Sequence, residues 1–137
     1  MNRRSIICGL AVIFSAGSLF AQTSWKGTVS TEWGRASNWT NGIPTASVNA
    51  IIGDANFTGS HQPAVTASSS CKSLSIGNGT KISILTVGRA LSISGNLTIG
   101  VNGTLAHTGR TITLSGNWNN SGSYTHTNNT GVTFSGD

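Results

Sequence analysis

A nine-residue segment of this chain occurs twice, and this repeat restricts the fold more than any other feature of the sequence. Residues 88–96 read Gly-Arg-Ala-Leu-Ser-Ile-Ser-Gly-Asn, and residues 109–117 read Gly-Arg-Thr-Ile-Thr-Leu-Ser-Gly-Asn. Five of the nine positions are identical, and the aliphatic and hydroxyl positions keep their character. Self-similarity at a period near twenty residues indicates a stacked-repeat architecture.

Apolar and polar residues alternate with period two throughout residues 71–137. Successive side chains of a strand point to opposite faces, so this alternation predicts short strands with one buried face. Glycine and asparagine punctuate the strands at turns. The expected core consists of Leu74, Ile76, Ile82, Ile84, Leu91, Ile93, Leu97, Ile99, Ile112 and Leu114. Gly95 and Gly116 would allow tight corners, and Asn96 and Asn117 would stack their side chains between laps.

Two all-β architectures fit these strands. Laps of about twenty residues suit a right-handed parallel β-solenoid, or β-helix, in which each coil buries its aliphatic residues against the next. An antiparallel β-sandwich also has strands at regular spacing, and it stays open as the alternative. The near-identity of the laps favours the solenoid, because a sandwich does not require it.

The N-terminus has the layout of a secretory signal peptide over residues 1–21. Arg3 and Arg4 precede an apolar run, and small residues lead to a cleavage site after Ala21. The run is too short for a membrane-spanning helix, so we expect no transmembrane segment after cleavage. We divide the rest into a tryptophan-rich capping segment, residues 22–70, and solenoid repeats, residues 71–137.

The charges after cleavage are few and scattered. Six lysines and arginines and three acids remain, so the net charge is +3 without any basic run. This distribution argues against a nucleic-acid partner. Cys71 is the one cysteine left, and we interpret it as a small buried residue.

Trp25, Trp33 and Trp39 fall within fifteen residues and are followed by Gly42-Ile43-Pro44-Thr45 and a predicted strand at residues 48–52. This order resembles the N-terminal unit of large secreted bacterial surface proteins with β-helical repeats, namely autotransporter-like and type IX-exported adhesins. Residues 116–136 are similar to their repeats. The resemblance implies a secreted or outer-cell-surface location and an adhesive role. Because the chain stops within a lap, we also expect the solenoid to be truncated here.

The residues offer little chemistry for catalysis. Glu32 and Asp54 are the only acids besides the last residue, and they are not clustered, so we expect no enzyme in this segment. His107 and His126 are repeat-equivalent, but two ligands without a nearby acid or cysteine make a poor metal site. We therefore predict a surface histidine ladder, no metal and no cofactor.

The tryptophans have two interpretations. Trp25, Trp33, Trp39 and Trp118 could present indole faces to sugar rings, or they could plug the end of the solenoid core. Their position at the start of the solenoid favours the plug. The sequence thus predicts a structural, adhesive β-solenoid module that meets an extracellular glycan or a host surface ligand, with a carbohydrate-binding module as the alternative. Ice binding by a threonine face is disfavoured, because Thr-x-Thr does not recur on every lap.

Overall fold

The computed structural model describes residues 20–136. The predicted signal peptide therefore lies, except for its last two residues, outside the described part of the chain. The strands are β1 (Gln22–Ser24), β2 (Asn49–Ile52), β3 (Ala64–Val65), β4 (Ser69–Cys71), β5 (Leu74–Ile76), β6 (Ser83–Val87), β7 (Leu91–Ile93), β8 (Leu97–Ile99), β9 (Gly103–His107), β10 (Thr111–Leu114), β11 (Trp118–Asn120), β12 (Ser123–His126) and β13 (Gly131–Phe134), and one short 3₁₀ helix, η1 (Ala36–Asn38), lies between β1 and β2.

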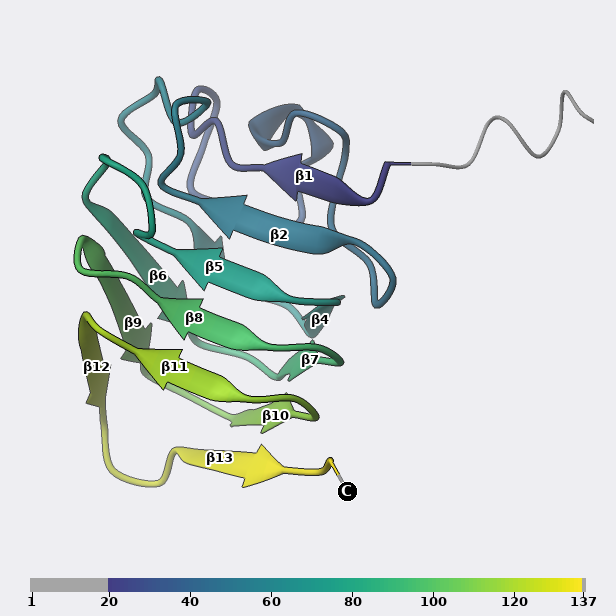
Figure 1. Ribbon diagram of the computed structural model, residues 1–137, viewed down its shortest axis with the longest axis vertical. Coiled ribbons are helices and arrows are strands. Elements are labelled where there is room, and N and C mark those ends of the chain that lie inside the picture. Colours follow the sequence, from purple (N-terminus) through teal and green to yellow (C-terminus); the bar gives the residue numbers. More distant parts are fainter. Residues whose placement is uncertain (1–19, 137) are drawn as a thin grey trace, which may run out of the picture.

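The strands wind into a right-handed β-solenoid with three parallel sheets (Figure 1). Sheet A has the strand order β1-β2-β5-β8-β11. Sheet C has the order β12-β9-β6-β3, and sheet D has the order β13-β10-β7-β4. Each coil visits sheet A, then sheet C, then sheet D, so β2–β4, β5–β7, β8–β10 and β11–β13 form four successive coils. The predicted solenoid is confirmed, and the parallel pairing excludes the antiparallel sandwich.

In-register stacking builds the core. In sheet A, Ala50, Leu74 and Leu97 lie on one another in adjacent coils, and in sheet D Leu91 lies on Ile112. These side chains point inward and are buried. Eight of the ten predicted core residues are confirmed, namely Leu74, Ile76, Leu91, Ile93, Leu97, Ile99, Ile112 and Leu114.

The prediction was wrong for Ile82 and Ile84, which are 72% and 39% exposed. Strand β6 turns its other face inward, and Leu85 and Val87 are fully buried instead. Register with β9 sets this phase, because Leu85 stacks on Leu105 and Val87 on His107. The inward position preceding them holds Ser83, whose hydroxyl oxygen lies only 2.5 Å from where a Cβ on Gly53 would be. An isoleucine there would collide with the backbone of the coil above.

Side chains at one corner link consecutive coils by bonds to the backbone. The Asn96 Oδ1 atom accepts a hydrogen bond from the Asn117 backbone N–H at 2.9 Å. One coil earlier, the Ser73 hydroxyl accepts from the Asn96 N–H at 3.0 Å. The predicted stacking of Asn96 and Asn117 is thus a side-chain-to-backbone ladder. A Cβ on Gly116 would meet the Gly95 carbonyl oxygen, so the corner admits only glycine there.

The first coil begins earlier than the predicted repeat region. The division between residues 70 and 71 falls inside β4, and β2 to β4 already form a complete coil. Residues 25–48 close the upper end of the core, as Figure 1 shows above β2.

Removing one core side chain tests the stacked interior. Leu91→Ala should lower the free energy of unfolding by about 2–5 kcal/mol, because the neighbouring coils can only partly fill the cavity. Ser92→Ala, on the outward face of the same strand, should change it by less than about 0.5 kcal/mol. Urea denaturation of both variants measures the difference, and equal losses would contradict an interior position for Leu91.

Cys71 gives the fold a dependence on alkaline pH. Burial of this thiol raises its pKa to about 12 from the usual 9.0. The unfolded chain loses the thiol proton above pH 9 while the folded chain keeps it, so stability is present below pH 9 and is lost as pH rises toward 12. We expect the native chain to lose about 1.4 kcal/mol more than Cys71→Ala between pH 8 and pH 10, measured by urea denaturation. Parallel losses in both proteins would contradict the burial effect.

Candidate functional site

Three tryptophans cover the upper end of the core as a single cluster. Trp25, Trp33 and Trp39 are 0%, 1% and 2% exposed. Their rings meet edge to face, with centroids 5.1 Å apart for Trp25 and Trp39 and 4.9 Å apart for Trp33 and Trp39. This geometry is favourable for aromatic pairs. We call the cluster the tryptophan cap.

Two of the cap indoles are held by backbone carbonyls. Trp25 donates its indole N–H to the His61 carbonyl at 2.8 Å, and Trp39 donates to the Trp33 carbonyl at 2.8 Å. The Trp33 indole nitrogen is buried and has no hydrogen-bond partner among the described residues. The cap therefore has one unsatisfied polar group.

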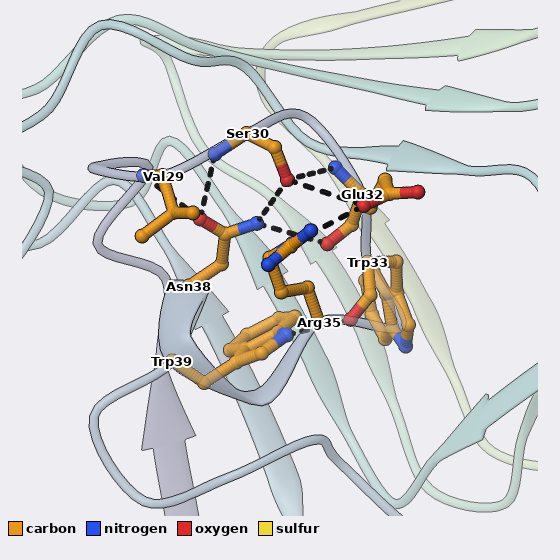
Figure 2. Close-up of polar contacts among 7 residues, drawn as sticks. All are labelled: Val29, Ser30, Glu32, Trp33, Arg35, Asn38 and Trp39. Atoms are coloured by element: carbon orange, nitrogen blue, oxygen red, sulfur yellow. Dashed lines mark hydrogen bonds and ion pairs between the residues drawn. The ribbon is translucent and has the colours of Figure 1, made fainter.

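Asn38 fastens the loop that carries these residues, as Figure 2 shows. Its side-chain oxygen accepts from the backbone N–H groups of Val29 and Ser30, both at 3.1 Å. Its amide nitrogen donates to the Ser30 hydroxyl and the Glu32 carbonyl, both at 3.0 Å. The Asn38 side chain is fully buried, and its four bonds join it to a loop whose own residues are partly exposed.

The four candidate binding tryptophans do not share one surface. Trp118 lies in β11 of the last coil, at the opposite end from the cap (Figure 1). It is half-buried and packs edge to face on Tyr124, with ring centroids 5.1 Å apart. In the cap, each indole contacts other indoles and is closed to solvent. Trp25, Trp33 and Trp39 therefore lie buried at the upper end of the core and not on an exposed surface.

The carboxylates of Glu32 and Asp54 make separate contacts, each with residues near it. Glu32 pairs with Arg35 at 3.3 Å on the surface, as Figure 2 shows. Asp54 accepts a hydrogen bond from the Ser24 hydroxyl at 2.7 Å and others from Asn56. Within residues 20–136, no three His, Cys, Asp or Glu side chains gather in a way that could hold a metal ion.

The histidines stack in register, but His107 does not lie on the surface. His126 pairs with His107 on adjacent coils, and His107 is fully buried. Its Nε2 atom donates to the Arg110 carbonyl, and its Nδ1 atom lies 3.0 Å from the Tyr124 hydroxyl. The predicted surface ladder is therefore wrong for His107, because the inward phase of β9 directs it into the core. Both ring nitrogens are occupied by protein partners.

Sheet D has the most uniform outward surface. The register places Ser70, Ser92, Thr113 and Thr133 in one column across four coils. A second column begins beyond the strand ends, where the Ser115 and Ser135 hydroxyls lie 3.0 Å apart. These side chains are small and uncharged, so the outer side of sheet D carries a regular column of hydroxyl groups, which we call the hydroxyl face.

A cleft of about 400 Å³ adjoins the upper end of the hydroxyl face. Glu32, Trp33, Ile43, Pro44 and residues 66–70 line it. Sequence reasoning did not find this site. Pro44, which prevents strand pairing, was the one available signal.

Comparison with protein-family models, curated proteins and solved structures gives no match. In residues 20–136 no helix has the length and apolar character needed to span a bilayer.

The bonds of Asn38 predict that it dominates the stability of the cap. Asn38→Ala leaves the Val29 and Ser30 N–H groups and the Glu32 carbonyl without their partner, so we expect a loss of about 3 kcal/mol or more. Asn41→Ala removes a single exposed bond to the Gln22 carbonyl and should cost about 1 kcal/mol or less. Urea denaturation followed by tryptophan fluorescence measures both, and equal effects would contradict the role of Asn38.

Proposed function

We propose that this chain is a secreted or cell-surface structural module whose solenoid holds an adhesive surface. The observation that supports it most is the hydroxyl face on a scaffold of four stacked coils. Four coils in parallel register fix the spacing of its side chains, because adjacent strands lie about 4.8 Å apart. Such a surface offers many weak polar contacts in fixed positions, which suits attachment to an extended ligand.

The start of the fold agrees with export. Strand β1 begins at Gln22, directly after the predicted cleavage position at Ala21, so removal of residues 1–21 leaves every described strand intact. Cleavage after Ala21 would remove one hydrogen bond, the one that the Ala21 carbonyl accepts from the Asn49 N–H at 3.0 Å, and would leave a new amino group on Gln22. We infer that the processed chain keeps the solenoid.

The ligand we expect is an extracellular glycan or a glycoprotein on a host surface. Hydroxyl groups both donate and accept hydrogen bonds, so a hydroxyl face suits a hydroxyl-rich partner. Glycan binding by the tryptophans is the alternative. Because the cap indoles are buried, that alternative rests on Trp118 at the last coil.

Adhesion assays with matched face variants test the proposal. Beads coated with residues 22–137 should be retained on immobilised glycans and glycoproteins, and Ser92→Lys/Thr113→Lys should lower retention at least tenfold. Lysines at these outward positions interrupt the column of hydroxyl groups while the core stays unchanged. The control, Ser75→Lys/Thr98→Lys on sheet A, should keep retention within twofold.

Two results would count against this function. No retention of the native chain on any glycan or glycoprotein would remove the adhesive role. Equal loss in both lysine pairs would remove the hydroxyl face as the binding surface, and loss only in Trp118→Ala would favour the carbohydrate-binding alternative.

A further inference from the structure

The tryptophan cap completes two sides of the first coil and leaves the third side open. In sheet A, β1 lies over β2. In sheet C, Glu32 pairs in parallel with Ala64, so the cap loop lies over β3. In sheet D, β4 is the end strand, and no strand within residues 20–136 pairs with its upper edge.

The open edge is bounded by hydrogen bonds at both ends. At one end, the Trp33 N–H donates to the Ala64 carbonyl at 3.0 Å. At the other end, the Lys72 N–H donates to the Val48 carbonyl at 2.9 Å. Residues 65–71, which include β4, lie between these bonds. The gap is therefore the length of one short strand.

The backbone groups of β4 alternate between its two edges. The Ser69 N–H donates to the Ala90 carbonyl at 3.0 Å, and the Cys71 carbonyl accepts from the Ser94 N–H at 3.1 Å, so both residues bond the coil below. In a parallel ladder the residues between them face the other way. Ser68 and Ser70 thus direct their N–H and C=O groups toward the open side.

The chain itself is kept out of this position. Residues 43–48 lead into β2 and would be the strand above β4 if the coil were regular. Pro44 has no N–H to give to a ladder, and the Ser94 hydroxyl donates to the Ala46 carbonyl at 2.8 Å from outside the sheet. The segment therefore runs around the gap and forms the outer wall of the 400 Å³ cleft.

The lining of the cleft suits an uncharged strand. Among the described residues that line it, Glu32 is the one that is charged, and it is paired with Arg35. Ser69 occupies the inward column that Leu91 and Ile112 fill in the coils below, so the column lacks an aliphatic side chain at this level. Trp33, whose indole nitrogen has no partner among the described residues, belongs to the same lining.

We propose that this cleft binds an extended, uncharged peptide strand of another molecule, which pairs in parallel with β4 and completes the upper layer of sheet D. This binding mode is strand addition to a sheet edge, where backbone bonds supply affinity and alternate side chains supply specificity. The preferred sequence alternates hydroxyl and aliphatic residues, as the chain's own sheet D strands do. Backbone groups at strand spacing favour a peptide over a glycan here. The inference goes beyond the adhesive role of the hydroxyl face.

A synthetic peptide with the sequence of residues 111–117, acetylated and amidated, is the probe. In the parallel register the N–H of its leucine faces the Ser70 carbonyl, and the N–H of its second threonine faces away. Methylating the leucine nitrogen should weaken binding at least tenfold, whereas methylating the threonine nitrogen should change it less than twofold. Isothermal titration calorimetry with the native chain measures all three peptides.

Protein variants locate the bound peptide. Ser70→Pro removes a donor that the sheet does not use and should weaken binding at least tenfold. Ser69→Leu fills the space in the inward column that an aliphatic side chain of the peptide would occupy, so it should also weaken binding at least tenfold. This variant leaves the backbone unchanged and serves as the test if Ser70→Pro fails to fold. Binding should also shift the indole N–H resonance of Trp33 in an ¹⁵N spectrum and leave that of Trp118 in place.

Three outcomes would overturn the proposal. The native peptide fails to bind, the two methylated peptides bind equally, or peptide binding is unchanged by Ser69→Leu because the peptide pairs with another edge, such as that of β13. Binding of a glycan in the cleft with no binding of the peptide would equally reject the peptide strand as its occupant.

Discussion

Parallel, in-register pairing of like residues on successive coils is the interaction on which the rest of this structure depends. It places aliphatic side chains directly above one another, so that Leu74 lies on Leu97 and Leu91 on Ile112, and it places serine and threonine in columns outside. Each strand is only two to five residues long, so no strand could persist alone. Stability comes from the shared interior, and the outer columns of serine and threonine follow from the same register.

A stacked core must be covered where the stack begins, and the tryptophan cap is the solution here. Three indoles replace the aliphatic layer that a further coil would supply, and buried Asn38 holds the loop that carries them. The loop follows the solenoid path on two sheets and leaves it on the third, where Pro44 prevents pairing. The same segment that closes the core thus leaves one strand edge open, which connects the architecture to the proposed peptide site.

The sequence was sufficient for the features that repetition determines. The nine-residue repeat predicted stacked coils, and the clustered tryptophans at the start of the first coil favoured the plug interpretation over an exposed platform. It was insufficient where the pattern is ambiguous. Residues 82–87 contain four aliphatic residues of six, so either face of β6 could point inward, and only pairing with β9 decides in favour of Leu85 and Val87. His107 was predicted to lie on the surface because its burial depends on which face of β9 points inward, and the sequence pattern alone does not specify that face. The cleft depends on the path of residues 43–48, which no local pattern specifies.

Disulfide trapping across adjacent coils tests the stacked register most directly. Ser92 and Thr113 are register partners on the outside of sheet D, and parallel partners lie about 4.8 Å apart, within the range that a disulfide can span. In a Cys71→Ala background, the pair Ser92→Cys/Thr113→Cys should cross-link under mild oxidation, whereas Ser92→Cys/Ser115→Cys, displaced by two residues, should cross-link much less. Mass spectrometry of the digested protein identifies the bond. Efficient cross-linking of the displaced pair without that of the partner pair would contradict the register, and with it the continuous core.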